Sequence, residues 1–243
     1  MSIAEIIRSV PPSQAVANAT AKIDPSKLAM GRGLERQTTT SLMAISSLHE
    51  KGAGETVFAE GDEANSVYEI VRGMVRLYKL LPDGRRQITG FLRAGSLLGL
   101  APDGVCVYTA EAITPVTLCR YKRTALERLI DEVPSFAKRL LMVTSHELRA
   151  AQDQMLLLGR KTAIEKVASF LLLMAERQDE EDAGEIEVPM TRNDIADYLG
   201  LTFETVSRTL SKLKQDRLIA LLARGCIRIL NHDRLQEVAA GEG

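Results

Sequence analysis

The chain has 243 residues, of which 45% are hydrophobic and 26% charged, and its formal net charge is −1 at neutral pH. These values are ordinary for a folded globular protein and exclude collagen-like, low-complexity and disulfide-scaffold classes. A nearly neutral chain has no general affinity for nucleic acid, so such a role would need positive charge concentrated in one segment.

The first 130 residues divide into a predicted arm and a predicted barrel. Residues 1–38 are expected to form a flexible N-terminal arm, because they contain Pro11, Pro12 and Pro25 and a polar run. From about residue 50, short alternating or apolar runs separated by glycines are typical of an antiparallel barrel, expected over residues 39–130. The predicted strands are Thr56–Phe58, Val67–Val71, Met74–Tyr78, Arg86–Thr89, Val105–Thr109 and Val116–Tyr121, with tight turns at Arg72-Gly73 and Pro82–Gly84.

Near residue 125 the hydrophobic period changes from two residues to 3.6, and Pro134 suits the first turn of a helix. Small and apolar residues then recur at alternating steps of four and three: Ala137, Leu141, Thr144, Leu148, Ala151, Met155 and Leu158. This heptad seam predicts a dimerisation helix over residues 131–159 and hence a homodimer. A helix of roughly 25 residues, about 38 Å long, would overhang a small barrel, although packing on its own barrel is the alternative.

Residues 160–243 are expected to form a second domain, with Gly159 and Arg160 marking a hinge. A helix is predicted from about Thr162 to Arg177, because apolar residues recur on one of its faces. These residues are Ala163, Val167, Phe170, Leu171 and Met174. The acidic run Asp179–Glu185 that follows is interpreted as a solvated connector.

A winged helix-turn-helix is predicted in the last 55 residues. Thr191 followed by Asp194 is close to a capping box, and Gly200 ends the short amphipathic helix Asp194–Leu199. Thr202 caps a second helix that runs to about Gln215, with Val206, Leu210 and Leu213 turned inward. Two helices joined at a glycine make a helix-turn-helix. Leu218–Leu222 and Cys226–Leu230, joined by the turn Ala223–Gly225, form the predicted wing.

Positive charge is concentrated in this part of the chain. Between Val188 and Leu230 there are seven basic and four acidic residues, and basic residues such as Lys212 neutralise DNA phosphates. Glu204, Ser207 and Arg208 lie on one face near the start of the second helix, the end that enters the major groove. Arg208 suits guanine, Glu204 suits a cytosine amine, and Ser207 suits thymine. The alternative is a plain surface ion pair between Glu204 and Arg208.

The segment Met190–Arg208 resembles the CRP/FNR superfamily of bacterial transcription regulators, and the likeness covers nearly the whole chain from about residue 50. Ser207, where the CRP branch has Gly, resembles the FNR/FixK branch. The resemblance implies an α+β fold: a cyclic-nucleotide-binding-like jelly roll, a long dimerisation helix and a C-terminal winged helix-turn-helix.

The resemblance also implies function. A homodimeric activator would bind double-stranded DNA at an inverted repeat of TTGA-like half-sites and contact RNA polymerase, for which the hairpin around Pro82–Arg86 lies in the right region. Arg208 would take guanine, Glu204 its partner cytosine and Ser207 a thymine. Phosphate contacts would come from Thr191, Asn193, Thr202 and Thr205. Phe203 departs from the Arg of the CRP branch, so no polar base contact is expected there.

The family's usual effectors do not suit the predicted barrel. Cyclic AMP binding needs a Gly-Glu-Leu segment and a following Arg-Ser pair, but Ser96 stands where the Glu should be and no Arg follows before Tyr108. An iron–sulfur cluster needs four thiolates, and residues 1–105 contain no cysteine. None of His49, His146 and His232 has a spacing that nominates a haem ligand. We therefore expect no cofactor, with an unidentified ligand or haem as the alternative.

The three cysteines, Cys106, Cys119 and Cys226, are widely spaced and lack a CxxC pair, which fits a reducing compartment. Cys119 is interpreted as an ordinary strand residue. Cys226, on the wing, is a possible redox thiol, although a packed strand residue is the commoner case. With no signal peptide pattern and no apolar run near the roughly 18 residues of a membrane span, we expect a cytoplasmic protein without a membrane partner. No constellation typical of an enzyme is present.

Overall fold

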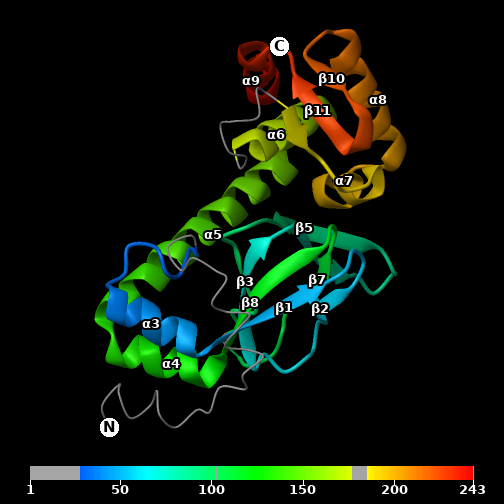
Figure 1. Cartoon of the computed structure of the whole chain (residues 1–243). Coiled ribbons are helices and arrows are strands. Elements are labelled where there is room, and N and C mark those ends of the chain that lie inside the picture. The colour runs from blue at the N-terminus through cyan, green and yellow to red at the C-terminus, as the bar shows by residue number, and fades with distance from the viewer. Residues whose placement is uncertain (1–27, 102, 177–184, 243) are drawn as a thin grey trace. The chain divides into compact units, whose positions relative to one another are not determined.

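The computed structural model describes residues 28–101, 103–176 and 185–242, and the chain forms two compact units (Figure 1). One unit comprises the residues up to Lys79 together with Thr89–Glu147, and the other comprises Leu80–Ile88 together with Leu148–Gly243. Among the described residues, no helix is both long and apolar enough to span a membrane. The α+β fold class is confirmed.

Two four-stranded sheets make up the barrel. One has the order β1 (Ser46–Lys51), β8 (Val116–Lys122), β3 (Ser66–Arg72) and β6 (Leu97–Leu98); the other has the order β2 (Thr56–Phe58), β7 (Thr109–Ala112), β4 (Val75–Leu80) and β5 (Arg86–Leu92). Aliphatic side chains fill the space between them, including Ile70, Val75 and Leu118. Gly73 has a φ of 89°, and the positive φ is what its predicted turn requires.

One predicted strand of the barrel is wrong, and strand β1 was missed. The strand expected at Val105–Thr109 begins only at Thr109, and residue 105 makes an isolated bridge to Glu63. The alternation that suggested a strand comes from Val105 and Val107 facing solvent on either side of buried Cys106. Strand β1 was not predicted, because its sequence SSLHEK is mostly polar; pairing with β8 along its whole length creates it.

Of the predicted N-terminal arm, residues 1–27 lie outside the described residues. The part that is described does not behave as a flexible arm. Leu28 and Met30 are buried in the same cluster as Tyr121, and the N–H groups of Ala29 and Met30 donate to the buried carboxylate of Glu69. Helices α3 (Arg36–Ala44) and α4 (Arg123–Glu132) contact each other and complete this unit.

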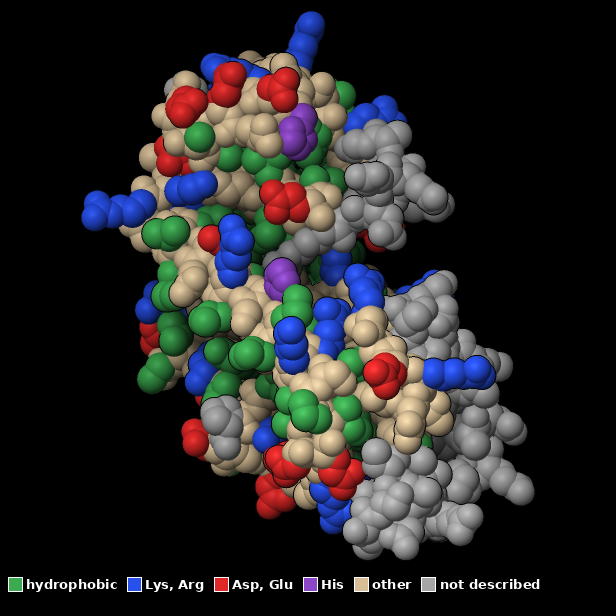
Figure 2. All heavy atoms as spheres, turned by 90° about the vertical axis from the view of Figure 1, so that its left-hand side faces the viewer, with side chains coloured by type: hydrophobic (Ala, Val, Ile, Leu, Met, Phe, Trp, Pro, Cys, Tyr) green, Lys and Arg blue, Asp and Glu red, His purple; other side chains and the backbone are tan. Residues whose placement is uncertain are grey.

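Helix α5 runs from Pro134 to Arg160, as the heptad pattern predicted. Three residues of α5 that are spaced by seven or a multiple of seven positions are buried: Phe136, Val143 and Leu157. The seam lies on a different side. Leu141, Leu148 and Met155 are 60 to 66% exposed in the single chain, whereas Ala137, Thr144 and Leu158 are half-buried and Ala151 is exposed. Figure 2 shows hydrophobic side chains gathered over the middle of the face that it views, with Lys and Arg among them.

The second unit contains the predicted winged helix-turn-helix. Helix α6 (Ala163–Glu176) is followed by β9 (Glu185–Glu187), α7 (Arg192–Leu199), α8 (Phe203–Gln215), β10 (Ile219–Leu221), the turn η2 (Ala223–Gly225), β11 (Cys226–Ile229) and α9 (His232–Ala240). The strands form a sheet of order β10-β11-β9. The apolar face of α6 packs as expected, with Val167, Phe170, Leu171 and Met174 buried. The acidic connector falls outside the described residues except for Glu185, which begins β9.

Candidate nucleic-acid interface

A complete capping box begins helix α7. The Thr191 hydroxyl accepts from the Asp194 N–H at 3.1 Å, and the Asp194 carboxylate accepts from the Thr191 N–H at 3.0 Å. The Thr191 hydroxyl also donates to that carboxylate at 2.8 Å. All the donors of Thr191 are thus used within the box, while Asn193, one residue into the helix, is exposed.

The turn between α7 and α8 is held by side chains from two other helices. Gly200 ends α7 with φ 61° and ψ 44°, the left-handed conformation that glycine adopts without strain. The carbonyl of Tyr198 accepts from the Gln154 side chain at 2.9 Å, and the carbonyl of Leu199 accepts from Lys166 Nζ at 3.2 Å. The carbonyls at the end of α7 therefore have donors, and the turn is fixed to α5 and α6.

Helix α8 begins at Thr202, as predicted. The Thr202 hydroxyl accepts from the Thr205 N–H at 3.2 Å, and the two hydroxyls lie 3.1 Å apart. Val206, Leu210 and Leu213 are buried, which fixes the rotation of the helix about its axis. The predicted inward face is confirmed, and it leaves the opposite face of α8 toward solvent.

That solvent-facing side carries the predicted base-reading residues. Glu204 and Arg208 are exposed and Ser207 is half-buried. Hydrogen bonds from its own N–H and from Thr202, helped by the charge of Arg208, hold the pKa of Glu204 below its usual range, so it is ionised at neutral pH. Among the ion pairs of the described residues, none joins Glu204 to Arg208, so the surface ion pair considered as the alternative is not formed.

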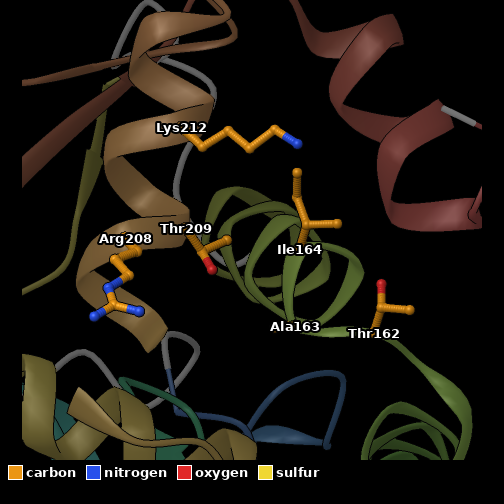
Figure 3. Close-up of a pocket in the computed structure, with 6 residues that line it drawn as sticks. All are labelled: Thr162, Ala163, Ile164, Arg208, Thr209 and Lys212. Carbon is orange, nitrogen blue, oxygen red and sulfur yellow. The ribbon is translucent and has the colours of Figure 1, made fainter. Parts of the chain in front are cut away.

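A hollow of about 350 Å³ lies between α8 and the start of α6 (Figure 3). Lys212 and Thr209 point from α8 toward Ile164, whereas the guanidinium of Arg208 points away from α6. Arg208 and Lys212 therefore face different directions. Lys212 lies beside the first turn of α6, where Thr162 and Ala163 also line the hollow. Arg208 lines the hollow too, but its guanidinium points out of it.

Arg86 is a residue of this unit whose role was missed in the sequence. Its Nη2 lies 2.5 Å from the Asp194 carboxylate, and its Nε donates to the Asp197 carboxylate at 2.8 Å. The neighbouring Gln87 side chain donates to the Asp197 carbonyl at 2.7 Å. A residue far away in sequence thus contacts two of the four acidic residues counted near α8 and offsets part of their negative charge, which leaves the positive charge of Arg208 and Lys212 less opposed.

The wing has the predicted strands, slightly shortened at their ends. Cys226 begins β11 and is half-buried, and its carbonyl accepts from the Leu222 N–H at 2.9 Å. Gly225 has φ +77°, and a Cβ there would lie 3.0 Å from the Val188 carbonyl oxygen, so glycine is needed at the tip. Arg228 pairs with Glu185 of β9. One of the seven basic residues counted between Val188 and Leu230 is therefore already paired with a carboxylate.

The barrel cysteine and histidine candidates lie in ordinary strand positions. Cys119 is buried in β8, and burial raises the pKa of its thiol, which makes it a poor nucleophile and a poor metal ligand. His49 lies in β1 with Nε2 3.1 Å from the Ser47 hydroxyl. In the part of the chain that the structure describes, no group of three or more His, Cys, Asp or Glu side chains is placed to hold a metal ion.

Family models match two parts of the chain: a cyclic nucleotide-binding domain matches residues 48–133, and a Crp-like helix-turn-helix domain matches residues 165–238. The transcriptional activatory protein AadR of Rhodopseudomonas palustris is 46% identical over 191 residues, covering 78% of this chain and 80% of the relative. The nitrogen fixation regulation protein FixK of Bradyrhizobium diazoefficiens is 46% identical over 192 residues, with coverage of 77% and 80%.

The chain belongs to the CRP/FNR family. Among solved structures, FixK2 from Bradyrhizobium japonicum matches with a TM-score of 0.76 and 42% identity, covering 80% of this chain and 97% of that chain. The predicted resemblance to the FixK branch is therefore confirmed. Within the CRP/FNR family, α7, α8 and the wing are the helix-turn-helix domain of a DNA-binding transcription regulator, and the relatives named are regulators of transcription, not enzymes.

The cyclic-nucleotide-binding type of domain does not by itself supply a nucleotide site in this CRP/FNR protein. The space between the sheets is filled by Ile70, Val75, Leu98 and other aliphatic side chains. Arg123, a cation at the start of α4, donates to the carbonyl oxygens of Ala64 and Gly99 at 2.5 and 3.1 Å. A buried cyclic phosphate needs a cationic or N–H partner, so these residues do not fit it.

Proposed function

We propose that this CRP/FNR regulator activates transcription as a homodimer that binds an inverted repeat of TTGA-like half-sites. The observation that carries the proposal is the capped helix α8, which presents Glu204 and Arg208 to solvent without pairing them to each other. Arg208 donates two hydrogen bonds to guanine, Glu204 accepts from the cytosine amine, and Ser207 touches a thymine.

The backbone contacts divide among several residues. Asn193, Thr202, Thr205 and Lys212 contact phosphates, since their polar groups lie at the exposed starts of α7 and α8 or beside the hollow at the start of α6. Thr191 acts differently from the expectation, because its donors are used in the capping box. We assign Thr191 to positioning α7, with Asn193 as the phosphate contact nearest to it.

The dimer pairs the seam of α5 with that of a second copy. Leu141, Leu148 and Met155 repeat every seven residues and are largely exposed in the single chain, and a stable seam buries such residues. This cytoplasmic activator contacts RNA polymerase. The exposed Leu80 and Leu81, beside the Pro82–Arg86 hairpin, suit that contact, whereas Arg86 is engaged with Asp194 and Asp197.

Fluorescence anisotropy with a labelled duplex that carries the inverted repeat tests the proposal. Arg208→Ala is expected to weaken binding on the order of 10- to 100-fold, while its affinity for a scrambled duplex changes little. Arg234→Ala, which removes an exposed arginine on α9, is the matched control and binds like wild type. Equal binding of the repeat by Arg208→Ala and wild type would refute the base-reading assignment.

A further inference from the structure

Phe203 is the first residue of α8, and its side chain is 47% exposed. Other apolar residues of this helix, Val206, Leu210 and Leu213, are buried in the core of the unit. Exposing an aromatic ring to water is unfavourable, and a ring of this size offers a large apolar area to a partner. Phe203 therefore offers an apolar contact area at the start of α8.

The ring lies beside the base-reading residues. On a helix, residues four apart are neighbours on the same face, so Phe203 lies above Ser207 while Glu204 lies above Arg208. These two pairs are adjacent, and they form one continuous patch at the start of α8. We call this patch, made of Phe203, Glu204, Ser207 and Arg208, the reading face. Three of its members offer polar groups and Phe203 offers only an apolar surface.

We propose that Phe203 recognises a thymine through the C5 methyl group and so helps to determine the sequence of the half-site. This inference rests on the proposed function, because it requires the reading face to enter the major groove. In that groove the thymine methyl is the apolar group that distinguishes thymine from the other bases, and phenylalanine is one of the side chains that contact it. The ring has no donor or acceptor, so it gains nothing from the polar edges of guanine, adenine or cytosine.

The expected effect follows from the size of the group. A methyl group buried against an apolar side chain contributes on the order of a three- to tenfold difference in affinity. Removal of the methyl should therefore cost that factor in the wild-type protein. The same removal should cost nothing once the ring is gone, because the methyl then has no apolar partner. The two changes should not be additive, and this coupling is the signature of direct contact.

The test uses the full chain and a duplex that wild-type protein selects from a randomised pool. Each thymine of the selected half-site is replaced in turn by deoxyuridine, which lacks only the C5 methyl group. Binding of wild type, Phe203→Ala and Phe203→Leu is measured on every duplex. We expect one replacement to weaken wild type three- to tenfold, to leave Phe203→Ala unaffected, and to weaken Phe203→Leu, since leucine retains an apolar contact.

Two outcomes would overturn the inference: no deoxyuridine duplex weakens wild type, or Phe203→Ala loses the same factor as wild type at every thymine. Circular dichroism of Phe203→Ala checks that the exposed substitution leaves the fold intact. A failure of the proposed function looks different. In that case the pool yields no preferred sequence, or Arg208→Ala binds the selected duplex as well as wild type does.

Discussion

Asp194 and Thr191 satisfy each other's backbone N–H groups at the start of α7, and the other oxygen of Asp194 lies 2.5 Å from Arg86 Nη2. The carboxylate, 2% exposed, is thus held from two directions. One contact is local and caps the helix, and the other comes from residue 86. The start of the helix-turn-helix therefore depends on residues that are distant in sequence.

The capping contact should be measurable in stability. Thr191→Ala is expected to lower the free energy of unfolding by about 1 kcal/mol, because it leaves the Asp194 N–H without its acceptor. The loss should not exceed this typical value for a cap, since Arg86 still holds Asp194. Urea denaturation followed by circular dichroism gives the value. Thr191→Ser keeps the hydroxyl and should unfold like wild type; a similar loss in this control would show that packing of the methyl group, not the cap, is responsible.

The Arg86 contacts give a second prediction with a neighbour as its control. Arg86→Ala should destabilise the protein by about 2 kcal/mol, because Asp194 is then buried without a cation. Arg85 is 77% exposed and pairs with the half-exposed Asp83, so Arg85→Ala should cost less than about 0.5 kcal/mol. Denaturation of the two variants side by side decides the matter, and equal losses would mean that the Arg86 contacts contribute no more than a surface pair.

The seam of α5 makes a prediction about assembly. Leu148→Glu is expected to convert the dimer to a monomer, since it places a charge in an apolar seam on both copies. Leu156→Glu is the matched control, because Leu156 is as exposed, at 66% against 60%, but lies off the seam. Sedimentation velocity separates the two states. A monomeric Leu156→Glu, or a dimeric Leu148→Glu, would place the interface elsewhere on the chain.

Glu69 predicts how stability depends on pH. Burial raises the pKa of Glu69 from 4.5 to about 7, although N–H groups of Ala29 and Met30 and the Tyr121 hydroxyl donate to it. Between these two pH values the folded protein retains a proton that the unfolded chain releases, so stability is greatest below pH 4.5 and falls as the pH rises to about 7. The loss amounts to at most about 3 kcal/mol.

Thermal melting at pH 5 and pH 8 measures this dependence. Glu69→Gln should remove most of the difference between the two conditions, because glutamine does not titrate and its one side-chain oxygen still accepts one of the two N–H groups. Glu127→Gln, on the exposed side of α4, is the control and should keep the wild-type difference. If Glu69→Gln melts with an unchanged pH dependence, another group is responsible.

Contacts between residues close together along the chain were predictable from the sequence, and contacts between distant residues were not. The Thr191–Asp194 box, the Gly200 cap and the Thr202 cap involve neighbours along the chain, so local pattern predicted each of them correctly. Strand β1 and the role of Arg86 escaped prediction for the opposite reason. The polar sequence of β1 becomes a strand only beside β8, and Arg86 meets Asp194 across 108 residues of chain. The face of α8 was predictable because its buried residues, Val206, Leu210 and Leu213, have helical spacing.

The bond from Gln154 to the Tyr198 carbonyl has a consequence for the evolution of the chain. Gln154 precedes Met155, a residue of the proposed seam, so in the proposed dimer one turn of α5 would contact both the second copy and the helix-turn-helix. An inserted residue between the N-terminal part of the seam and Gln154 would rotate the seam residues by about 100° relative to Gln154 and shift them by about 1.5 Å along the helix. In the proposed dimer, the length of α5 between the seam and Gln154 would therefore set the spacing of the two helix-turn-helix units, and with it the spacing of the half-sites that they bind.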